Sequence, residues 1–428
     1  MTNGTRLLVV SNGHGEDQIA RRVCDAILGI YPQIQVSAVP LVGLGDAFKD
    51  ANGIHCVPGT APLPSGGFLR SVSTIIKDLG SGLIAQHQDR RDVIRELLAD
   101  KFDIVLAVGD IYALWMASGA YIRLGGTGMG DDNDIQHSGS LLSQLQHRAM
   151  HFMSKIDKKH SGFLDGGIQT KNPLIFMPTA KSDRFMPHSR LERQIIKRLA
   201  LVTITRDPET AEGLTGHGLH AVYGGNPMFD GLLDGRKMPV KRRSGPLKLG
   251  ILPGSRDEAL GNLQLIADLL NRTRVKTQIT VALAPTIDFP ALRAHFRDSL
   301  WVAYDDRLQH SRSGLQLLFS RDFLGVLYAS DLIIGLAGTA NEQAATLRKR
   351  VICFKGTGPQ SSKKRFIEQS KLMGERILFL DQTGEALFLA LNAILEEPTP
   401  HYLPQPRSLK DAAPTVATLI LKETGLID

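Results

Sequence analysis

Cysteine is scarce in this sequence, and long apolar runs are missing altogether. The 428 residues include three cysteines, Cys24, Cys56 and Cys353, whose odd number and wide separation argue against a disulfide framework or a zinc-binding pair. No stretch approaches the roughly 20 consecutive apolar residues that a membrane-spanning helix requires. The first residues also lack the basic and long apolar segments of a signal peptide. We therefore expect a cytoplasmic chain.

Acidic residues are also not in excess in this sequence. The 50 Lys and Arg residues exceed the 43 Asp and Glu residues and give a formal net charge of +7. This balance favours anionic partners such as nucleotide diphosphates or an anionic membrane surface. Nucleic acid is not expected, because basic residues are not interleaved with aromatic ones and no nucleic-acid-binding motif is found. The alternative is an enzyme whose surface is merely basic.

Short apolar runs recur along both halves of the chain and are separated mostly by helix-like stretches. They lie at 6–10, 35–39, 104–108, 174–176 and 202–205, and then at 248–252, 279–283, 315–319, 332–335, 351–354 and 377–380. This alternation predicts an α/β fold with two Rossmann-like domains on parallel sheets. The length fits this division, since single domains rarely reach 428 residues.

The predicted domains are an N-terminal one over 1–235 and a C-terminal one over 247–400, joined by a basic, Pro-containing linker over 236–246. Residues 401–428 contain a last helix that can belong to either domain, including by packing back on the N-terminal one. An insertion over about 125–172 is left open as a lid, a membrane contact or a disordered segment. We interpret its clustered histidines as solvated surface rather than metal ligands.

The first apolar run ends in a glycine-rich turn, Ser11-Asn12-Gly13-His14-Gly15. Such turns lie at the carboxyl edge of a doubly wound sheet, where ligands bind, and Gly13 and Gly15 permit close backbone approach. A dinucleotide fingerprint is not supported, because Gln18 stands where its third glycine belongs. His14 is the functional candidate, as a hydrogen-bonding partner for a sugar or phosphate oxygen. The alternative is a tight turn alone, with the following acids complementing the helix dipole.

A second candidate is Asp110, which follows the buried-type strand at 104–108. A carboxylate at the carboxyl end of a parallel strand is suited to removing a proton from an acceptor hydroxyl group. The equally weighted alternative is that Asp110 caps the following helix.

Two turns in the second half are typical of phosphate binding. Gly254-Ser255-Arg256 offers backbone N–H groups, a hydroxyl and a forked cation to an anion, although the ending of a P-loop is absent. Gly338-Thr339-Ala340-Asn341 offers free N–H groups to a diphosphate, and Glu342 offers a carboxylate to both ribose hydroxyls. Because Thr339 and Glu342 also have the spacing of a capping box, a purely structural helix start is the alternative.

Together these features resemble the lipid-A-disaccharide synthase-related proteins of the GT-B glycosyltransferase superfamily. The matching stretches are SNGHGEDQIA, PLVGLGDAF, PSGGFLRS, AVGD, PTAKSD, TRDPETAEGL, YGGNPMFDGL, ILPGSRDE and GLAGTANEQAATL. The resemblance implies two facing Rossmann-like domains with a central cleft, a UDP-sugar co-substrate in the C-terminal domain, and a lipid-linked acceptor in the N-terminal one. It also implies inverting sugar transfer without a metal or other cofactor.

Carried over residue by residue, the resemblance assigns Gly254-Ser255-Arg256 to the donor phosphates and Glu342 to the ribose. It assigns Asp110 to the general base, with His14 as the less favoured base.

Asn226 and Lys181, from the stretches YGGNPMFDGL and PTAKSD, complete the predicted substrate-binding set. Asn226 replaces the histidine of a Gly-His-Pro motif in the family. The Gly-His-Gly turn and the insertion also depart from the family on the acceptor side, so the acceptor need not be a lipid A precursor.

The main interpretation is an inverting glycosyltransferase that moves a sugar, of the UDP-GlcNAc type, from a UDP-sugar to a lipid-linked acceptor. Apolar residues between 68 and 84 have the spacing of an amphipathic helix for peripheral contact with the inner face of the cell membrane, although a core helix has the same spacing. The alternatives are a nucleotide-sugar epimerase on the same fold and a non-catalytic UDP-sugar-binding relative. The sugar, the acceptor and a monomeric or homodimeric state stay open.

Overall fold

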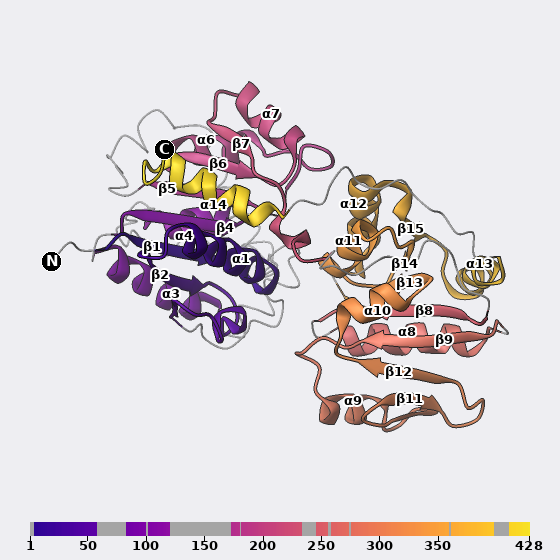
Figure 1. Ribbon diagram of the computed structural model, residues 1–428. Helices are drawn as coiled ribbons and strands as arrows, with labels where there is room; N and C mark the ends of the chain where they lie inside the picture. The colour runs from indigo at the N-terminus through magenta and orange to yellow at the C-terminus, as the bar shows by residue number, and fades with distance from the viewer. Residues whose placement is uncertain are drawn as a thin grey trace, which may run out of the picture. The chain divides into compact units, whose positions relative to one another are not determined.

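The computed structural model describes residues 4–57, 83–99, 102–119, 173–179, 181–232, 245–255, 258–273, 275–358, 361–397 and 411–428, without the side chains of residues 14 and 83–89. The chain divides into two compact α/β units (Figure 1). Unit 1 comprises Met1–Pro227 and Ala412–Asp428, and unit 2 comprises Met228–Asp411. The predicted insertion over about 125–172, the apolar residues 68–82 and the predicted phosphate ligand Arg256 lie outside the described residues.

Unit 1 is built on a parallel sheet. Its described strands lie in the order β3-β2-β1-β4-β5-β6-β7, and all neighbours pair in parallel. The central strands β1 (RLLVVS) and β4 (IVLAVG) are buried almost throughout, which explains the apolar run that each contains. The bounds are β1 (Arg6–Ser11), β2 (Gln35–Pro40), β3 (Ile54–Cys56), β4 (Ile104–Gly109), β5 (Leu174–Pro178), β6 (Val202–Thr205) and β7 (Ala221–Tyr223).

Helices follow most strands of this sheet and begin at recognisable caps. Ser189 and Glu192 form a capping box at the start of α6, and Asp207 caps α7 ahead of Pro208. The described helices of unit 1 are α1 (His14–Ile30), η1 (Asp46–Phe48), α3 (Leu83–Ala99), α4 (Ile111–Ala117), α6 (Arg190–Leu199), α7 (Pro208–Gly216) and α14 (Ala412–Glu423). The short helix η2 (Pro227–Phe229) spans the point where the chain passes to unit 2.

The last helix, α14, belongs to unit 1 and packs against α1 (Figure 1). One face of α14 is fully buried, at Val416, Ala417, Ile420 and Leu421. Gly224, after β7, allows the helix to approach, because a Cβ added there would lie 2.5 Å from Ile204 Cγ2 and 2.9 Å from Val416 Cγ2. The C-terminal residues therefore complete the core of unit 1.

Unit 2 is built on a mixed sheet with a parallel centre. Its described strands lie in the order β10-β11-β12-β9-β8-β13-β14-β15, in which β10 and β11 form an antiparallel extension beside β12. The strand bounds are β8 (Leu247–Leu252), β9 (Thr277–Ala282), β10 (Trp301–Ala303), β11 (Arg307–His310), β12 (Gln316–Ser320), β13 (Leu332–Gly335), β14 (Val351–Phe354) and β15 (Ile377–Leu380). The described helices are α8 (Ala259–Asn271), α9 (Phe289–Phe296), α10 (Phe323–Ala329), α11 (Thr339–Thr346), α12 (Lys363–Met373), η4 (Gly374–Arg376) and α13 (Gly384–Glu396).

The predicted fold class, two Rossmann-like α/β domains, is confirmed. Each predicted apolar run corresponds to a strand, and strands and helices alternate along the chain. The strands β3, β7, β10 and β11, of three or four residues each, were not predicted; β3 and β11 also contain polar residues. The structure divides the chain after Pro227, ahead of the predicted boundary at residue 235.

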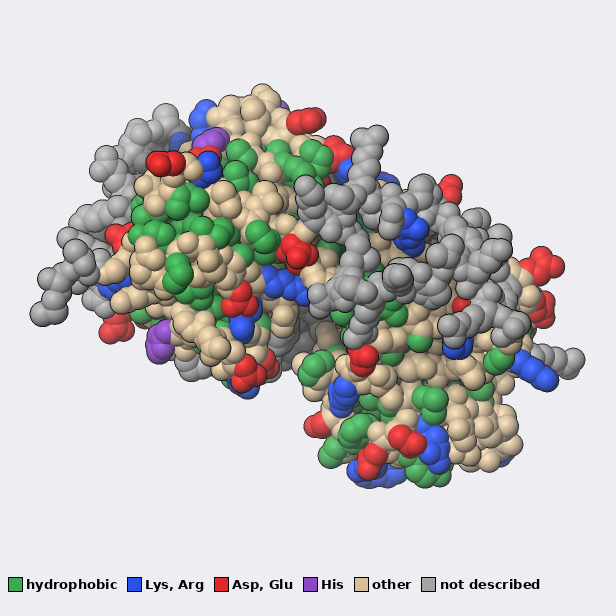
Figure 2. Space-filling view, in the orientation of Figure 1, with side chains coloured by type: hydrophobic (Ala, Val, Ile, Leu, Met, Phe, Trp, Pro, Cys, Tyr) green, Lys and Arg blue, Asp and Glu red, His purple; other side chains and the backbone are tan. Residues whose placement is uncertain are grey.

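Charged side chains of both signs are interspersed on the face shown in Figure 2. The positive net charge is therefore not gathered into a single patch on that face. None of the helices in the described ranges is both long enough and apolar enough to cross a membrane.

The contact of Gly224 with α14 gives a test of the packing in unit 1. Gly224→Ala should lower the free energy of unfolding by about 1–3 kcal/mol, the usual cost of overpacking a filled core. Gly216→Ala is the matched control, because nothing lies within 4 Å of a Cβ at Gly216. Urea unfolding of both variants checks the prediction, and equal stabilities would contradict it.

Candidate functional site

The carboxyl ends of β8, β13 and β14 meet at one edge of the unit 2 sheet, because these strands are parallel neighbours. Gly254, in the turn after β8, has φ +109°, a conformation that favours glycine. A Cβ there would lie 3.9 Å from the Leu336 carbonyl oxygen, in the turn after β13. The structure thus brings together the predicted turns at Gly254-Ser255 and 338–341.

A buried asparagine that was not predicted as a site residue connects these turns. Asn262, on α8, is 0% exposed. Its Nδ2 donates to the Pro253 carbonyl oxygen at 3.1 Å and to Ser361 Oγ at 2.9 Å. Its Oδ1 accepts from the Thr357 N–H at 2.9 Å, and Ser361 Oγ donates to the Leu336 carbonyl oxygen at 3.2 Å. The turns after β8, β13 and β14 are therefore linked by hydrogen bonds.

Side-chain amides also fix the turn between β13 and α11. Asn341 is fully buried and donates from Nδ2 to the Gly335 carbonyl oxygen at 3.0 Å. Gln369, on α12, donates from Nε2 to the Gly338 carbonyl oxygen at 2.7 Å. A Cβ at Gly335 would lie 2.0 Å from Asn341 Oδ1, so only glycine fits there. The backbone of the predicted phosphate turn is thus held from inside the unit.

Glu342 does not form the capping box that its spacing from Thr339 suggested. Gly338 is the N-cap residue of α11, and no side chain caps this helix. Glu342 is only 5% exposed, and its Oε1 accepts from Gln369 Nε2 at 3.3 Å and lies 3.4 Å from Arg365 Nη2. The capping alternative for Glu342 is therefore wrong, because groups on α12 engage the carboxylate instead.

In unit 1, Asp110 is the N-cap residue of α4. Its Oδ1 accepts from the backbone N–H groups of Tyr112 at 2.9 Å and Ala113 at 3.3 Å. Burial raises the pKa of Asp110 above its ordinary value; the capping bonds oppose this shift, and the negative charge of Glu16 adds to it. The capping alternative is confirmed. The carboxyl group of Asp110, at the end of β4, nevertheless has a raised pKa, and shifted pKa values are typical of catalytic acids and bases. Its predicted role as a base stays a prediction.

Further polar groups gather at this edge of the unit 1 sheet. β1 and β4 approach so closely that a Cβ at Gly109, which has φ +148°, would lie 2.6 Å from Asn12 Cβ. Thr179, after β5, donates from Oγ1 to Glu16 Oε1 at 3.1 Å. Asn12, Glu16 and Thr179 therefore join Asp110 at one edge, and none of the three was predicted as a site residue.

The predicted glycine turn after β1 is the start of α1. Gly13 is the N-cap residue, and His14 and Gly15 lie in the first turn. The His14 side chain lies outside the described structure, so its role as a ligand or base stays a prediction.

Asp17, also near the start of α1, is buried with 1% exposure. Ser11 Oγ donates to its Oδ1 at 2.5 Å. Burial raises the pKa of Asp17 to about 7; the Ser11 bond opposes the shift, and the negative charges of Glu16 and Asp46 add to it. The alternative interpretation of this turn counted Asp17 as a partner of the helix dipole; the structure buries this acid beside Ser11, with a raised pKa.

Lys181 and Asn226 lie in unit 1 on separate loops. Lys181 Nζ lies 2.5 Å from Oε2 of Glu192, which also belongs to the capping box of α6. Asn226 is half-buried just before η2. The substrate contacts predicted for both residues stay predictions.

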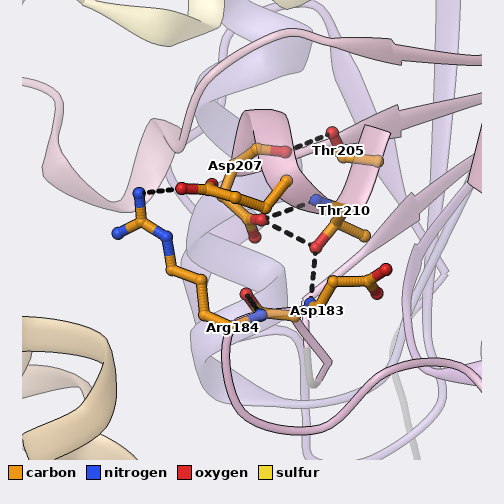
Figure 3. A network of polar contacts seen from close by, with 7 residues as sticks. Asp183, Arg184, Thr205, Asp207 and Thr210 are labelled. Atoms are coloured by element: carbon orange, nitrogen blue, oxygen red, sulfur yellow. Dashed lines mark hydrogen bonds and ion pairs between the residues drawn. The ribbon is translucent and has the colours of Figure 1, made fainter. Parts of the chain in front are cut away.

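A polar network joins the stretches PTAKSD and TRDPETAEGL (Figure 3). Asp207 Oδ1 accepts from the Thr210 N–H at 2.9 Å and from Thr210 Oγ1 at 2.7 Å. Thr210 Oγ1 accepts from the Asp183 N–H at 3.0 Å, and Thr205 Oγ1 donates to the Asp207 carbonyl oxygen at 2.8 Å. These stretches therefore hold the loop after β5 against the start of α7, which is a structural role.

Asn262 and Gln369, the two unit 2 residues that were not predicted, share one feature in the sequence. Asn262 occupies the apolar face of α8, with Ala259, Leu263 and Ile266, all buried. Gln369 is likewise buried beside Phe366 on α12. A polar side chain on the apolar face of a helix, close in space to a glycine turn, is the pattern that would have indicated them.

The described ranges contain no group of three or more His, Cys, Asp or Glu side chains that could hold a metal ion. The expected independence from metal stays a prediction.

Comparison with known proteins identifies a fold and no family. No protein-family model matches the sequence, and no curated protein matches it. Among solved structures, the chain is similar to Staphylococcus aureus MnaA with UDP, at 12% identity and a TM-score of 0.56, covering 99% of this chain and 98% of that one. It is also similar to the Methanocaldococcus jannaschii UDP-GlcNAc 2-epimerase with UDP-GlcNAc and UDP, at 12% identity and a TM-score of 0.53, covering 98% and 100%. The chain therefore has the two-domain GT-B fold.

The buried carboxyl of Asp17 predicts a pH-dependent stability. The folded chain holds this proton up to about pH 7, whereas the unfolded chain releases it near the ordinary pKa of 3.8. The folded state thus binds more protons in this window, and stability is lost as the pH rises from about 4 to about 7. Asp17→Asn should reduce this loss by on the order of 1 kcal/mol per pH unit.

Urea unfolding at several pH values between 4 and 8 measures the effect. Asp25→Asn, an exposed carboxylate on the same helix, is the control. Identical pH slopes for the wild type and Asp17→Asn would show that the group does not titrate in this range.

Proposed function

We propose that this chain is an enzyme that acts on a UDP-sugar and that unit 2 holds the nucleotide. The observation that carries the proposal is the meeting of two glycine turns, at 254–255 and 338–341, at one edge of a parallel sheet. Backbone N–H groups at the start of α11, together with the helix dipole, favour a diphosphate there. The Asn341 N–H, which was predicted to be free, is instead bonded to the Gly338 carbonyl oxygen at 3.1 Å. The likeness in fold to structures determined with UDP supports a uridine nucleotide.

Glu342 is suited to binding the ribose. A carboxylate can accept hydrogen bonds from both ribose hydroxyls, and Glu342 lies in the first turn of α11. Gln369 and Arg365, both on α12, orient its carboxylate, and the cation of Arg365 offsets its charge. An anionic diphosphate is therefore less repelled than it would be by an unpaired carboxylate.

We propose epimerisation of the sugar as the reaction. Epimerisation at the carbon next to the anomeric centre can remove the proton of that carbon while the C1–O bond to UDP breaks, and it ends when a proton returns to the other face and UDP re-forms the C1–O bond. It therefore needs ionisable groups but no acceptor and no oxidant. The carboxyl of Asp110, with its raised pKa, and the neighbouring Glu16 supply such groups. The fold likeness to a UDP-GlcNAc 2-epimerase favours this reaction and a UDP-GlcNAc-type substrate.

Inverting sugar transfer is the second candidate. The resemblance of the sequence to lipid-A-disaccharide synthase-related proteins favours it, with a lipid-linked acceptor at the inner face of the cell membrane. In that reaction Asp110 takes the proton from the acceptor hydroxyl group as its oxygen attacks the anomeric carbon, and the bond from that carbon to UDP breaks, so that UDP leaves.

The ribose contact is tested by Glu342→Gln. The variant should weaken UDP binding roughly 10- to 100-fold, the value of a hydrogen bond to a charged group. It should also lose the preference for UDP over 2′-deoxy-UDP, because that preference depends on the second hydroxyl. Isothermal titration measures both affinities.

Glu368→Gln is the matched control for this variant. Glu368 is a buried carboxylate on α12 that also approaches Arg365, at 3.7 Å. Equal loss of affinity in both variants, or an unchanged 2′-deoxy-UDP ratio in Glu342→Gln, would remove Glu342 from the ribose site.

The reaction is tested by incubating the purified protein with UDP-GlcNAc in deuterated water without an acceptor. Epimerisation predicts a second UDP-sugar that carries deuterium at the inverted carbon, detected by NMR. Asp110→Asn should lower turnover by roughly 10²- to 10⁴-fold. Asp103→Asn is the control and should leave turnover unchanged, because Asp103 precedes β4 at the end of the strand opposite to Asp110.

Sugar transfer predicts a different outcome. No product would form with UDP-GlcNAc alone, and adding a lipid extract would move labelled sugar into the organic phase. Normal turnover of Asp110→Asn in either assay would exclude it as the proton-transfer group.

A further inference from the structure

Every polar atom of the Asn262 side chain is engaged by the turns around it. Nδ2 donates to the Pro253 carbonyl oxygen at 3.1 Å and to Ser361 Oγ at 2.9 Å. Oδ1 accepts from the N–H and the hydroxyl of Thr357, at 2.9 and 3.1 Å. The amide therefore uses two donors and accepts two bonds in a fully buried position, which an aspartate or a leucine cannot reproduce.

The turn after β14 lies directly on Asn262. A Cβ at Gly356 would lie 2.4 Å from Asn262 Oδ1, and a Cβ at Gly261 would lie 3.0 Å from Thr357 Oγ1. Glycine at these two positions brings the backbone within hydrogen-bonding distance of the amide. Hydrogen bonds to Asn262 therefore set the position of this turn.

Ser361 connects Asn262 to the turn after β13. Its Oγ accepts from Asn262 and donates to the Leu336 carbonyl oxygen at 3.2 Å. Leu336 directly follows β13 and precedes the N-terminus of α11. A displacement of Asn262 would thus be transmitted to both proposed phosphate turns.

We propose that Asn262 is a positioning residue that holds the turns after β8 and β13 at the spacing that a diphosphate requires. This inference rests on the proposed binding of a UDP-sugar by unit 2. Asn262 does not touch the nucleotide; it acts through the Pro253 carbonyl and, by way of Ser361, the Leu336 carbonyl. Preformed turns bind an anion more tightly, because no ordering of the backbone is then required on binding.

The test compares UDP with uridine, which has the base and the ribose but no phosphate. Asn262→Ala should raise the Kd for UDP at least about tenfold, equivalent to about 1.4 kcal/mol, and leave the Kd for uridine within about twofold. Ser361→Ala removes the link to Leu336 and one bond of Asn262 Nδ2 but keeps the bonds of Asn262 to Pro253 and Thr357, so it should have a smaller effect in the same direction. It keeps the test decisive if Asn262→Ala does not fold, as judged by thermal unfolding.

Asn271→Ala is the matched control, because Asn271 ends the same helix and accepts from Ser313 Oγ at 2.5 Å. It should change neither Kd. Folded Asn262→Ala and Ser361→Ala variants with an unchanged ratio of UDP to uridine affinity would overturn the inference while leaving the proposed function intact. Absence of UDP binding by the wild-type chain would overturn both.

Discussion

Parallel hydrogen bonding between strands is the constraint on which the rest of both units depends. In unit 1, β1 and β4 pair so that Ser11 lies beside Val108, and in unit 2, β8 and β13 pair so that Leu252 lies beside Gly335. A parallel register places the carboxyl ends of neighbouring strands, and the helix N-termini that follow them, at one edge. Within each unit, the polar groups at this edge therefore come from residues far apart in the sequence.

The two edges differ in their chemistry. At the unit 2 edge, the neutral amides of Asn262, Asn341 and Gln369 hold the turns. The carboxylate nearby, Glu342, lies close to the cation of Arg365. At the unit 1 edge, carboxyl groups lie close enough for one to raise the pKa of another. An anionic diphosphate is thus better accommodated at the first edge, whereas the second offers groups for proton transfer.

The sequence predicted most of this fold, because buried parallel strands are continuous apolar runs and leave a signal that needs no knowledge of their partners. It also predicted the two turns of unit 2, where glycines mark close backbone approach. It failed for contacts between distant residues. Glu342 has the local spacing of a capping box, yet its partners Gln369 and Arg365 lie on a different helix. The sequence does not show that Asn262 is hydrogen-bonded to Thr357 and Ser361, because these residues lie far from it along the chain.

A structural and a functional role are often treated as competing interpretations of a residue at the carboxyl end of a strand. In this fold they coincide, because the strand end is also the N-terminus of the next helix. Asp110 shows why: both capping bonds go to Oδ1 and fix the orientation of the carboxyl group, while burial keeps its pKa raised. A group that the fold has already ordered needs no further ordering when substrate binds. The cap at α4 is therefore an argument for a role of Asp110 in proton transfer and not against it.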